Sequence, residues 1–278
     1  MNDRVILTGL VLGAYPYGEY DRRLVVLTKE RGKVTMWANG ARRAQSPLRA
    51  GTQTLCYGRF DTFMNRDGYR INSVEVGNYF PEITGNIERT YLASYFCELA
   101  DYETSENVDE HRILVLLYQS LRAISNDAIG PELARLCFEF KMFWLSGEGP
   151  ELRQCVHCRK ASGEKVFSVR HGGRVCRDCA GVYFDPVSRE KKELEEGRLS
   201  HNWFNLSEAA WYTLEFISQT PAERLFTFTL RPEVLSELNE VVGAWKQNYL
   251  DHRFNSLESL GRLDEYRRLL ENVKKKTD

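Results

Sequence analysis

The chain has 278 residues and a formal net charge of −1, with 42% hydrophobic and 28% charged residues. This composition is ordinary for a soluble globular protein, excludes a predominantly disordered one, and leaves room for two or three domains. The N-terminus lacks the long apolar run of a signal peptide, and no stretch approaches the roughly 18 apolar residues of a membrane span, so we expect a cytoplasmic protein without a membrane segment.

The small net charge hides an uneven distribution along the chain. Residues 1–80 carry 12 Lys and Arg against 7 Asp and Glu, whereas residues 81–154 carry 6 against 13. Residues 155–198 are again basic, with 10 against 7. A basic N-terminal segment that is masked by an acidic one indicates a polyanionic partner.

The first 80 residues are strand-like. Short apolar and alternating segments are separated by turns that contain Gly or Asp, which favours a small closed or partly open β-barrel, with an SH3-like barrel as the alternative. The candidate strands are Val5–Val11, Arg22–Leu27, Lys33–Trp37, Thr54–Phe63 and Tyr69–Val76.

The connection after the third candidate strand, residues 39–51, is strongly basic. It contains Arg42, Arg43 and Arg49 and no carboxylate, and its Gly and Pro residues keep it out of regular structure. Such a loop can lie along a phosphate backbone. The alternative is a solvated loop whose arginines have no ligand.

Helical patterns follow the strands and resume after residue 199. Apolar residues recur at helical spacing, and their aromatic stripes are typical of a packed core. The later helices have apolar faces too large to stay exposed, so we expect one helical domain made of residues 81–154 and 199–278. The predicted helices are 87–99, 113–124, 133–144, 207–217 with Ser207 as N-cap, and 232–249.

Two Cys-x-x-Cys pairs interrupt this helical domain. Cys155 and Cys158 are followed after seventeen residues by Cys176 and Cys179. Four thiolates in two facing turns provide the tetrahedral sulfur set that Zn²⁺ accepts, and four protein ligands leave no open position. We therefore predict one structural zinc ion. Two disulfides or four unrelated thiols are the alternatives.

The residues between the cysteine pairs predict a small β-structure. Lys165–Val169 and Arg174–Val175 read as strands on either side of a turn at 171–173. We expect each cysteine pair at the tip of a hairpin, in an inserted zinc-ribbon-like module over residues 155–198. The predicted fold class is thus multidomain α+β.

The remaining cysteines and the nearby histidines have no assigned chemistry. Cys56, Cys97 and Cys137 stand apart in apolar surroundings, as buried reduced thiols do in a reducing compartment. His157 and His171 are expected to be surface polar residues, because four cysteines complete the metal shell.

No enzymatic motif is present in the sequence. The chain has no P-loop, no His-Glu-x-x-His, no Gly-x-Ser-x-Gly and no Rossmann glycine pattern. Zinc deaminases need a His-x-Glu motif upstream of Pro-Cys-x-x-Cys, which is missing here. We therefore predict a binding protein and not an enzyme. A zinc hydrolase with three protein ligands is the enzymatic alternative.

The order of these parts resembles the RecO family of recombination mediators. Three N-terminal runs carry the resemblance, together with the cysteine pairs and a run near the C-terminus. The runs are Gly18–Leu24, Leu27–Lys33, Asn39–Arg43 with Leu48–Arg49, and Phe254–Leu260.

The resemblance implies an N-terminal OB-fold over residues 1–80, a helical domain and a zinc-binding insertion. It also implies binding of single- and double-stranded DNA and annealing of complementary strands. The implied partners are RecR, single-stranded-DNA-binding protein and, indirectly, RecA, which would be loaded on DNA in the cytoplasm at the nucleoid. Family members differ in whether they keep all four cysteines, and this chain keeps them.

We expect the DNA-binding face on the barrel. Arginine suits it because the planar guanidinium group grips phosphate and stacks on bases. Tyr17, Tyr20 or Trp37 are candidate stacking residues, with barrel core as the alternative, and Lys274–Lys276 could add a basic tail. The predicted phosphate contacts are Arg22, Arg23, Lys33, Arg42, Arg43 and Arg49.

One rival hypothesis needs no DNA. In it the chain is a zinc-ribbon scaffold protein of transcription or translation, without direct DNA binding, and the basic loop is incidental.

Overall fold

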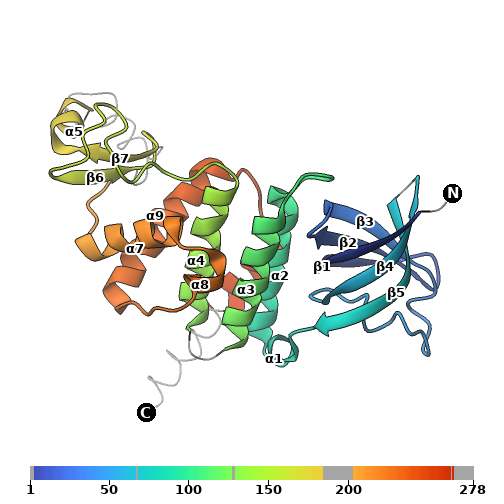
Figure 1. Ribbon diagram of the computed structural model, residues 1–278. Helices are drawn as coiled ribbons and strands as arrows, with labels where there is room; N and C mark the ends of the chain where they lie inside the picture. Colours follow the sequence, from blue (N-terminus) through green and yellow to red (C-terminus); the bar gives the residue numbers. More distant parts are fainter. Residues whose placement is uncertain (1–2, 67, 127–128, 184–202, 264, 266–278) are drawn as a thin grey trace, which may run out of the picture. The chain divides into compact units, whose positions relative to one another are not determined.

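The computed structural model describes residues 3–66, 68–126, 129–183, 203–263 and 265 (Figure 1). They form two compact units: one contains the described residues of Met1–Ala134 and Arg253–Asp278, and the other those of Arg135–His252. Residues 184–198 of the predicted zinc module and the lysine tail Lys274–Lys276 lie outside the described residues.

The first unit begins with a closed five-stranded barrel. Its strand order is β1-β2-β3-β5-β4, with β4 pairing antiparallel to β1 and β3 pairing parallel to β5. This arrangement is the predicted OB-fold and not an SH3-like barrel. The strands are β1 (Arg4–Tyr17), β2 (Asp21–Thr28), β3 (Gly32–Ala38), β4 (Tyr57–Asn65) and β5 (Gly68–Asn78).

The barrel interior is filled by every second residue of its strands. In β3 the pattern alternates strictly, with Val34 and Met36 buried and Thr35 and Trp37 half-buried. Phe60 of β4 is fully buried in the barrel core beside aliphatic residues of β1 and β2. Alternation across a pleated strand thus separates an apolar core from an outer face.

Phe60→Ala should lower the free energy of unfolding of the protein by about 3–5 kcal/mol, because a buried phenyl ring is lost and a cavity remains. Chemical denaturation followed by circular dichroism measures the loss. Phe63→Ala on the same strand is the matched control, since Phe63 is only half-buried and lies outside the core cluster. Equal losses in the two variants would contradict the assignment of Phe60 to the core.

Helices cover part of the outer surface of the barrel. The chain leaves β5 through α1 (Pro81–Thr84) and continues in α2 (Ile87–Glu103) and α3 (His111–Ser125). Both α2 and α3 contact β1 (Figure 1). Leu10 and Leu27 are paired in register and fully buried but lie outside the core cluster, so their burial comes from the chain that covers the sheet.

The C-terminal part of the chain returns to the first unit. Phe254 is almost fully buried, and its ring packs edge-on against Tyr95 of α2 at 5.4 Å. Ser256 donates its hydroxyl to Glu98 Oε1 at 2.7 Å and its backbone N–H to Glu98 Oε2 at 3.3 Å. The carboxylate of Glu98 therefore satisfies a donor at the start of helical segment 255–263, as a capping residue does.

The second unit combines helices with a small sheet. Its helices are α4 (Pro131–Leu145), of which residues 135–145 belong to this unit, α5 (Arg177–Tyr183), α7 (Glu208–Gln219), α8 (Ala222–Leu225) and α9 (Pro232–Tyr249). Its sheet has the order β7-β6-β8, from β6 (Lys165–Ser168), β7 (Gly173–Cys176) and β8 (Trp203–Phe204). Within the described residues, no helix has both the length and the apolar character needed to span a bilayer.

Buried polar contacts fasten the long helices of this unit. Lys246 of α9 donates to Glu139 of α4 at 2.7 Å, and Glu139 is only 3% exposed. Lys141 of α4 donates to the carbonyl of Ser218 in α7 at 2.8 Å. The Ser207 hydroxyl accepts from the Ala210 N–H, which confirms the predicted N-cap of α7.

Candidate metal centre and nucleic-acid interface

The four predicted metal ligands come together in the second unit. The Sγ atoms of Cys155, Cys158, Cys176 and Cys179 all lie within 4.8 Å of one another, and those of Cys158 and Cys176 are 3.6 Å apart. Four sulfurs at about 2.3 Å from a tetrahedral Zn²⁺ are separated by about 3.8 Å. The four cysteines can therefore hold a metal ion, and their donor set suits zinc.

The two cysteine pairs are presented differently. The first lies in a turn, where the Arg159 N–H donates to the Cys155 carbonyl and the Cys155 N–H to the Lys160 carbonyl, each at 2.9 Å. In the second pair, Cys176 ends β7 and Cys179 lies in α5. The prediction of a hairpin tip for each pair is wrong, because the β6–β7 turn holds neither pair and the chain after Cys176 enters a helix.

The β6–β7 turn is shaped by a close backbone approach. Gly173 has a φ of 135°, and a Cβ atom there would lie 2.2 Å from the Glu151 carbonyl oxygen. Glu151 accepts the Arg174 N–H at 2.7 Å through that same oxygen. Glycine is therefore required at this position, and it ties the segment before the first cysteine pair to β7.

The ionisation of the thiols reflects their proximity. Burial raises the pKa of Cys155, but the backbone N–H groups of Cys158, Cys176 and His157 outweigh burial and lower that pKa to about 6. A hydrogen bond with Cys176, followed by burial, raises the pKa of Cys179 to about 12. Adjacent sulfurs thus do not all ionise on their own, and a divalent cation would supply the compensating charge.

The cysteine cluster sits on very little apolar core. Its buried residues are Cys155, Val175, Cys176 and Ala180. On the other side of β6, Phe167 is fully buried, with its ring 6.0 Å from Trp211 of α7 and 5.7 Å from Trp245 of α9. The module is thus supported on one side by aromatic packing and on the other by its cysteines.

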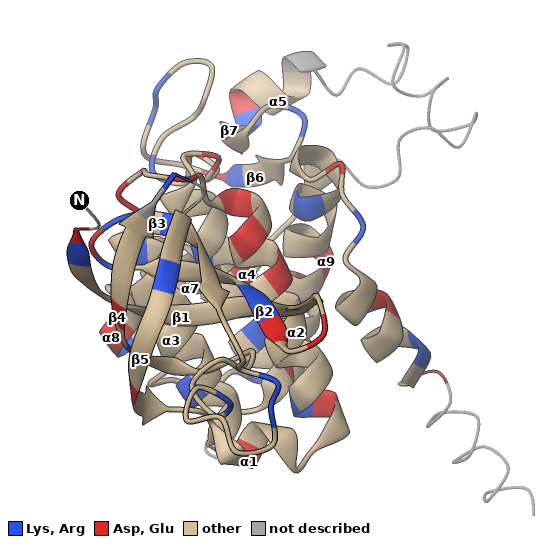
Figure 2. Ribbon diagram, turned by 90° about the vertical axis from the view of Figure 1, so that its right-hand side faces the viewer, with Lys and Arg blue, Asp and Glu red and all other residues tan. Residues whose placement is uncertain are grey.

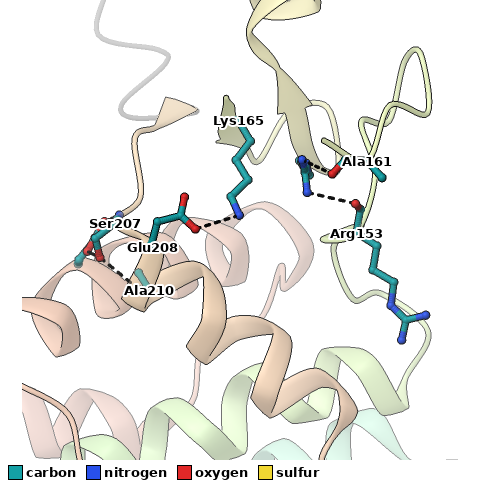
Figure 3. Close-up of polar contacts among 8 residues, drawn as sticks. Arg153, Ala161, Lys165, Ser207, Glu208 and Ala210 are labelled. Atoms are coloured by element: carbon teal, nitrogen blue, oxygen red, sulfur yellow. Dashed lines mark hydrogen bonds and ion pairs between the residues drawn. The ribbon is translucent and has the colours of Figure 1, made fainter. Parts of the chain in front are cut away.

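Polar contacts also join β6 to α7 and β7 to the loop of the first cysteine pair (Figure 3). Lys165 Nζ lies 3.5 Å from Glu208 Oε2 and 4.8 Å from the centroid of the Trp211 ring. The buried Arg174 guanidinium donates to the carbonyls of Arg153 at 3.1 Å and Ala161 at 2.6 Å. Arg174 thereby joins the loop that carries the first cysteine pair to β7.

The two nearby histidines pair with each other. His157 Nε2 and His171 Nδ1 are 2.8 Å apart, and the His171 ring also contacts Trp203. His157 is exposed and His171 is half-buried. The prediction of a surface residue is therefore confirmed for His157, whereas His171 is half-buried because the β6–β7 turn brings it against His157 and Trp203.

A thiol-reactivity experiment can separate the two classes of cysteine. Burial raises the pKa of Cys56 to about 11 and that of Cys97 and Cys137 higher still, so these thiols stay protonated at pH 8. Because the thiolate is the nucleophile, chelator-treated folded protein should react with a disulfide reagent at the cluster only, and all seven cysteines should react in denaturant. Rapid reaction in a protein whose cluster cysteines are all Ser would contradict this expectation.

Three of the predicted DNA contacts line one cavity on the barrel. The cavity has a volume of about 410 Å³, and its walls carry no carboxylate side chain. The pKa of Arg22 is lowered, first by burial and then by the positive charges of Arg42 and Arg49. The residues that line the cavity are Ala14, Pro16, Arg22, Arg42, Arg49, Gln53 and Thr54.

Backbone carbonyls hold these three guanidinium groups in place. Arg22 donates to the carbonyls of Thr52 at 3.0 Å and Arg49 at 3.2 Å. Arg42 donates to the carbonyls of Gly18 at 3.3 Å and Glu19 at 3.2 Å, and Arg49 donates to the carbonyl of Ala44 at 3.4 Å. Among the residues that the structure describes, none of the three cavity arginines forms an ion pair.

The outer face of β1, β2 and β3 carries aromatic and basic residues in one row. Tyr15, Arg23 and Trp37 are register partners across the three strands. The Arg23 guanidinium lies 5.1 Å from the Tyr15 ring centroid, and the Tyr17 ring packs edge-on against Trp37 at 4.7 Å. Trp37 is half-buried outside the core cluster, so the barrel-core alternative is wrong for it.

A second exposed cation–π pair is formed by Arg43 and Tyr20. Arg43 is stacked over Tyr20 at 5.1 Å, and the Arg42 N–H donates to the Tyr20 carbonyl at 2.8 Å. Tyr15, Tyr17 and Tyr20 are 44–55% exposed. In Figure 2 the basic positions of β2 appear in blue on this part of the barrel. Apart from Lys33, the predicted residues therefore divide into two groups. The cavity group is Arg22, Arg42 and Arg49, and the stacking group is Tyr17, Tyr20, Arg23, Trp37 and Arg43.

Lys33 lies apart from both groups. Its Nζ is 2.9 Å from Asp101 Oδ1 of α2, and it also donates to the Asp101 carbonyl at 2.5 Å. The Lys33 side chain is only 18% exposed. It joins the barrel to α2 inside the first unit, so the structure does not bring it to the other predicted contacts.

Sequence reasoning missed Tyr15, Gln53 and Thr54. The signal for Tyr15 was present, because extending the first strand past Val11 places Tyr15 and Tyr17 on one face by alternation. Gln53 and Thr54 had no local signal. They reach the cavity only because the connection after β3 folds back over Arg22.

Family models match most of the chain. The model of the N terminal of recombination protein O matches residues 1–80, which contain the barrel. The model of the C terminal of recombination protein O matches residues 84–191, which include α2, α3, α4 and all four cysteines of the cluster. The two matches together cover more than half of the chain.

Relatives are similar over most of their length. A protein of Alkaliphilus metalliredigens is 31% identical over 252 residues, which are 90% of this chain and 96% of that protein. One of Acetivibrio thermocellus is 29% identical over 92% of this chain and 96% of its own, and one of Desulforudis audaxviator is 37% identical over 65% and 71%. Each is named DNA repair protein RecO. With its OB-fold barrel, its cysteine cluster and these matches, the chain belongs to the RecO family of DNA repair proteins.

Proposed function

We propose that this protein is a recombination mediator that binds single- and double-stranded DNA through its OB-fold barrel. In this proposal it anneals complementary strands and acts with RecR and single-stranded-DNA-binding protein to load RecA, in the cytoplasm at the nucleoid. The observation that carries the proposal is the carboxylate-free cavity lined by Arg22, Arg42 and Arg49, with exposed tyrosines beside it.

The residues of the barrel suit a strand whose sequence is not read. Arginine donates in a planar fork to phosphate oxygens whatever the base, and it stays charged at every physiological pH. Exposed aromatic rings such as Tyr15 and Tyr17 stack on any base, since every base has a π-face. Binding through phosphates and base faces leaves the hydrogen-bonding edges of the bases available for pairing.

Annealing follows from that mode of binding without a catalytic residue. Two complementary strands repel each other through their phosphates, and neutralisation by a basic surface removes part of that barrier. If their base edges stay exposed on the protein, correct pairs can form between them. The protein would then hold two complementary strands close together on one basic surface.

We also propose that the cysteine cluster holds one Zn²⁺ ion with a structural role. All four ligands are protein thiolates, so no position remains for a substrate or an activated water. When bound, the ion fixes the turn at Cys155 and Cys158 to the end of β7. The proposed domains are an OB-fold over residues 1–80, a helical domain over 81–154 and 199–278, and a zinc-binding module over 155–198.

A gel-shift and annealing experiment tests the function. Purified protein should retard a random-sequence single-stranded oligonucleotide and should accelerate annealing of complementary strands that are coated with single-stranded-DNA-binding protein. A scaffold protein of transcription or translation should do neither. Failure to retard the oligonucleotide at low salt would reject DNA binding, and retardation without faster annealing would reject the mediator role.

A further inference from the structure

We propose that the cavity of Arg22, Arg42 and Arg49 is a site for the terminal phosphomonoester of a DNA strand. The protein would then recognise strand ends as well as follow the backbone. This inference rests on the proposed function, because it requires that the barrel bind DNA. It adds the chemical group that the cavity selects.

The walls of the cavity match a small, highly charged anion. Three guanidinium groups, the amide of Gln53 and the hydroxyl of Thr54 all provide hydrogen-bond donors. Asp21, the acidic residue next to Arg22, accepts the Gly40 N–H at 2.7 Å and does not line the cavity. A backbone phosphodiester carries one negative charge, whereas a terminal phosphomonoester carries about two near neutral pH and has three acceptor oxygens.

The arginines are held before any ligand arrives. Within the described residues, every guanidinium hydrogen bond of Arg22, Arg42 and Arg49 uses Nη1, and each goes to an uncharged oxygen. A guanidinium group has five N–H donors on three nitrogens, so the carbonyls fix each group without exhausting its donors. A ligand that meets preorganised donors loses less free energy to ordering.

Charge crowding in the cavity favours a dianion. The pKa of Arg22 is lowered by burial and by its two arginine neighbours, which means that the three positive charges repel one another in the free protein. An anion placed among them relieves this repulsion, and a second negative charge increases the relief in proportion. The same cavity therefore prefers a strand end to an internal phosphate.

Exposed tyrosines lie next to cavity residues in the chain or in its hydrogen bonds. Arg42 lines the cavity while its backbone N–H bonds the carbonyl of Tyr20, and the Tyr20 ring is covered by Arg43. Pro16 lines the cavity from β1, and Tyr15 and Tyr17 flank Pro16 on the opposite face of that strand. We expect the nucleotide next to a phosphate in the cavity to reach the Tyr20 ring, and the bases beyond it to pass round the edge of β1 to Tyr15 and Tyr17.

The test compares three forms of one internally labelled dT12 oligonucleotide. They carry a 5′-phosphate, a 3′-phosphate or two hydroxyl ends, and Kd for the full-length protein is measured by fluorescence anisotropy. We expect one phosphorylated form to bind about tenfold more tightly than the hydroxyl form, as one or two additional charge-assisted hydrogen bonds would produce. The comparison of the two phosphorylated forms identifies the end that is recognised.

Two matched variants place the effect in the cavity. Gln53→Glu adds a carboxylate to the cavity wall and should abolish the tenfold gain. Gln45→Glu makes the same change of charge at an exposed residue of the same connection that does not line the cavity, and it should keep the gain. Both residues are exposed, so neither substitution touches the core.

The outcomes separate this inference from the proposed function. Equal Kd values for all three oligonucleotides would overturn the end site and leave DNA binding intact. The same conclusion would hold if thymidine monophosphate competed with the oligonucleotides but a terminal phosphate gave no gain in affinity. No binding of any oligonucleotide would overturn the proposed function itself. A gain that survives in Gln53→Glu would remove the site from this cavity.

Discussion

Replacement of Cys176 by serine is expected to remove the bound metal and to unfold the segment 150–183. Cys176 ends β7 and is nearly fully buried in the small core around the cluster. That core has four buried residues, so apolar burial alone stabilises it little. Structural zinc contributes about 10–16 kcal/mol of apparent binding free energy in model fingers, which is far more than one lost thiol group would cost elsewhere.

Metal analysis and limited proteolysis measure this effect. Wild-type protein should contain one equivalent of metal and resist cleavage in residues 150–183, whereas Cys176→Ser should contain none and be cleaved there. Cys56→Ala is the control, because it removes a buried thiol from the barrel core and should retain the metal. A Cys176→Ser protein that keeps both its metal and its resistance would contradict a four-cysteine structural site.

The double variant Arg42→Ala/Arg43→Ala is expected to weaken DNA binding by at least tenfold at moderate salt and to change its salt dependence. Arg42 lines the cavity and Arg43 lies over the Tyr20 ring, so the double variant removes one arginine from the cavity group and one from the stacking group. If about five phosphates are neutralised on a single strand, log affinity falls with log salt at a slope of roughly −3.5. Loss of two contacts should reduce that slope to roughly −2.

Titrations of an oligonucleotide at several salt concentrations give both slopes. Arg59→Ala/Arg66→Ala is the matched control, because it removes two exposed arginines of the barrel that lie in neither group. The control should lower affinity slightly through net charge and leave the slope near the wild-type value. Identical slopes for all three proteins would reject the proposed face.

The sequence predicted the elements of the barrel because alternation and turn residues act locally. All five strands and the helices α2, α3 and α4 were expected near their observed positions, although the short α1 was not predicted and β1 continues six residues beyond the predicted Val11. Polar and small residues such as Thr8, Gly9 and Gly13 weaken the apolar pattern of that strand. Pairing with β4 ends at Leu10, and pairing with β2 alone maintains the strand to Tyr17.

The functional groups were harder to predict, because their positions depend on chain that is distant in sequence. Arg22 and Arg23 are adjacent, and the pleat sends one into the cavity and the other onto the outer face. In the sequence Lys33 resembles another phosphate contact, but in the fold it forms an ion pair with Asp101 of α2. The Cys-x-x-Cys spacing was sufficient to predict the four metal ligands, since a metal ion constrains the spacing of its ligands directly. It did not show that the first pair lies in a turn and that the second leads into a helix.

The contact between Ser256 and Glu98 has a consequence for the order in which the chain becomes folded during synthesis. These residues are 158 positions apart, and the whole second unit lies between them in sequence. The barrel and α2 leave the ribosome early, but the side of α2 that carries Tyr95 waits for Phe254 until the second unit has been translated. The apolar side of α2 therefore stays uncovered while the second unit is synthesised, where chaperones can bind it, and full protection of α2 reports that translation has passed Ser256.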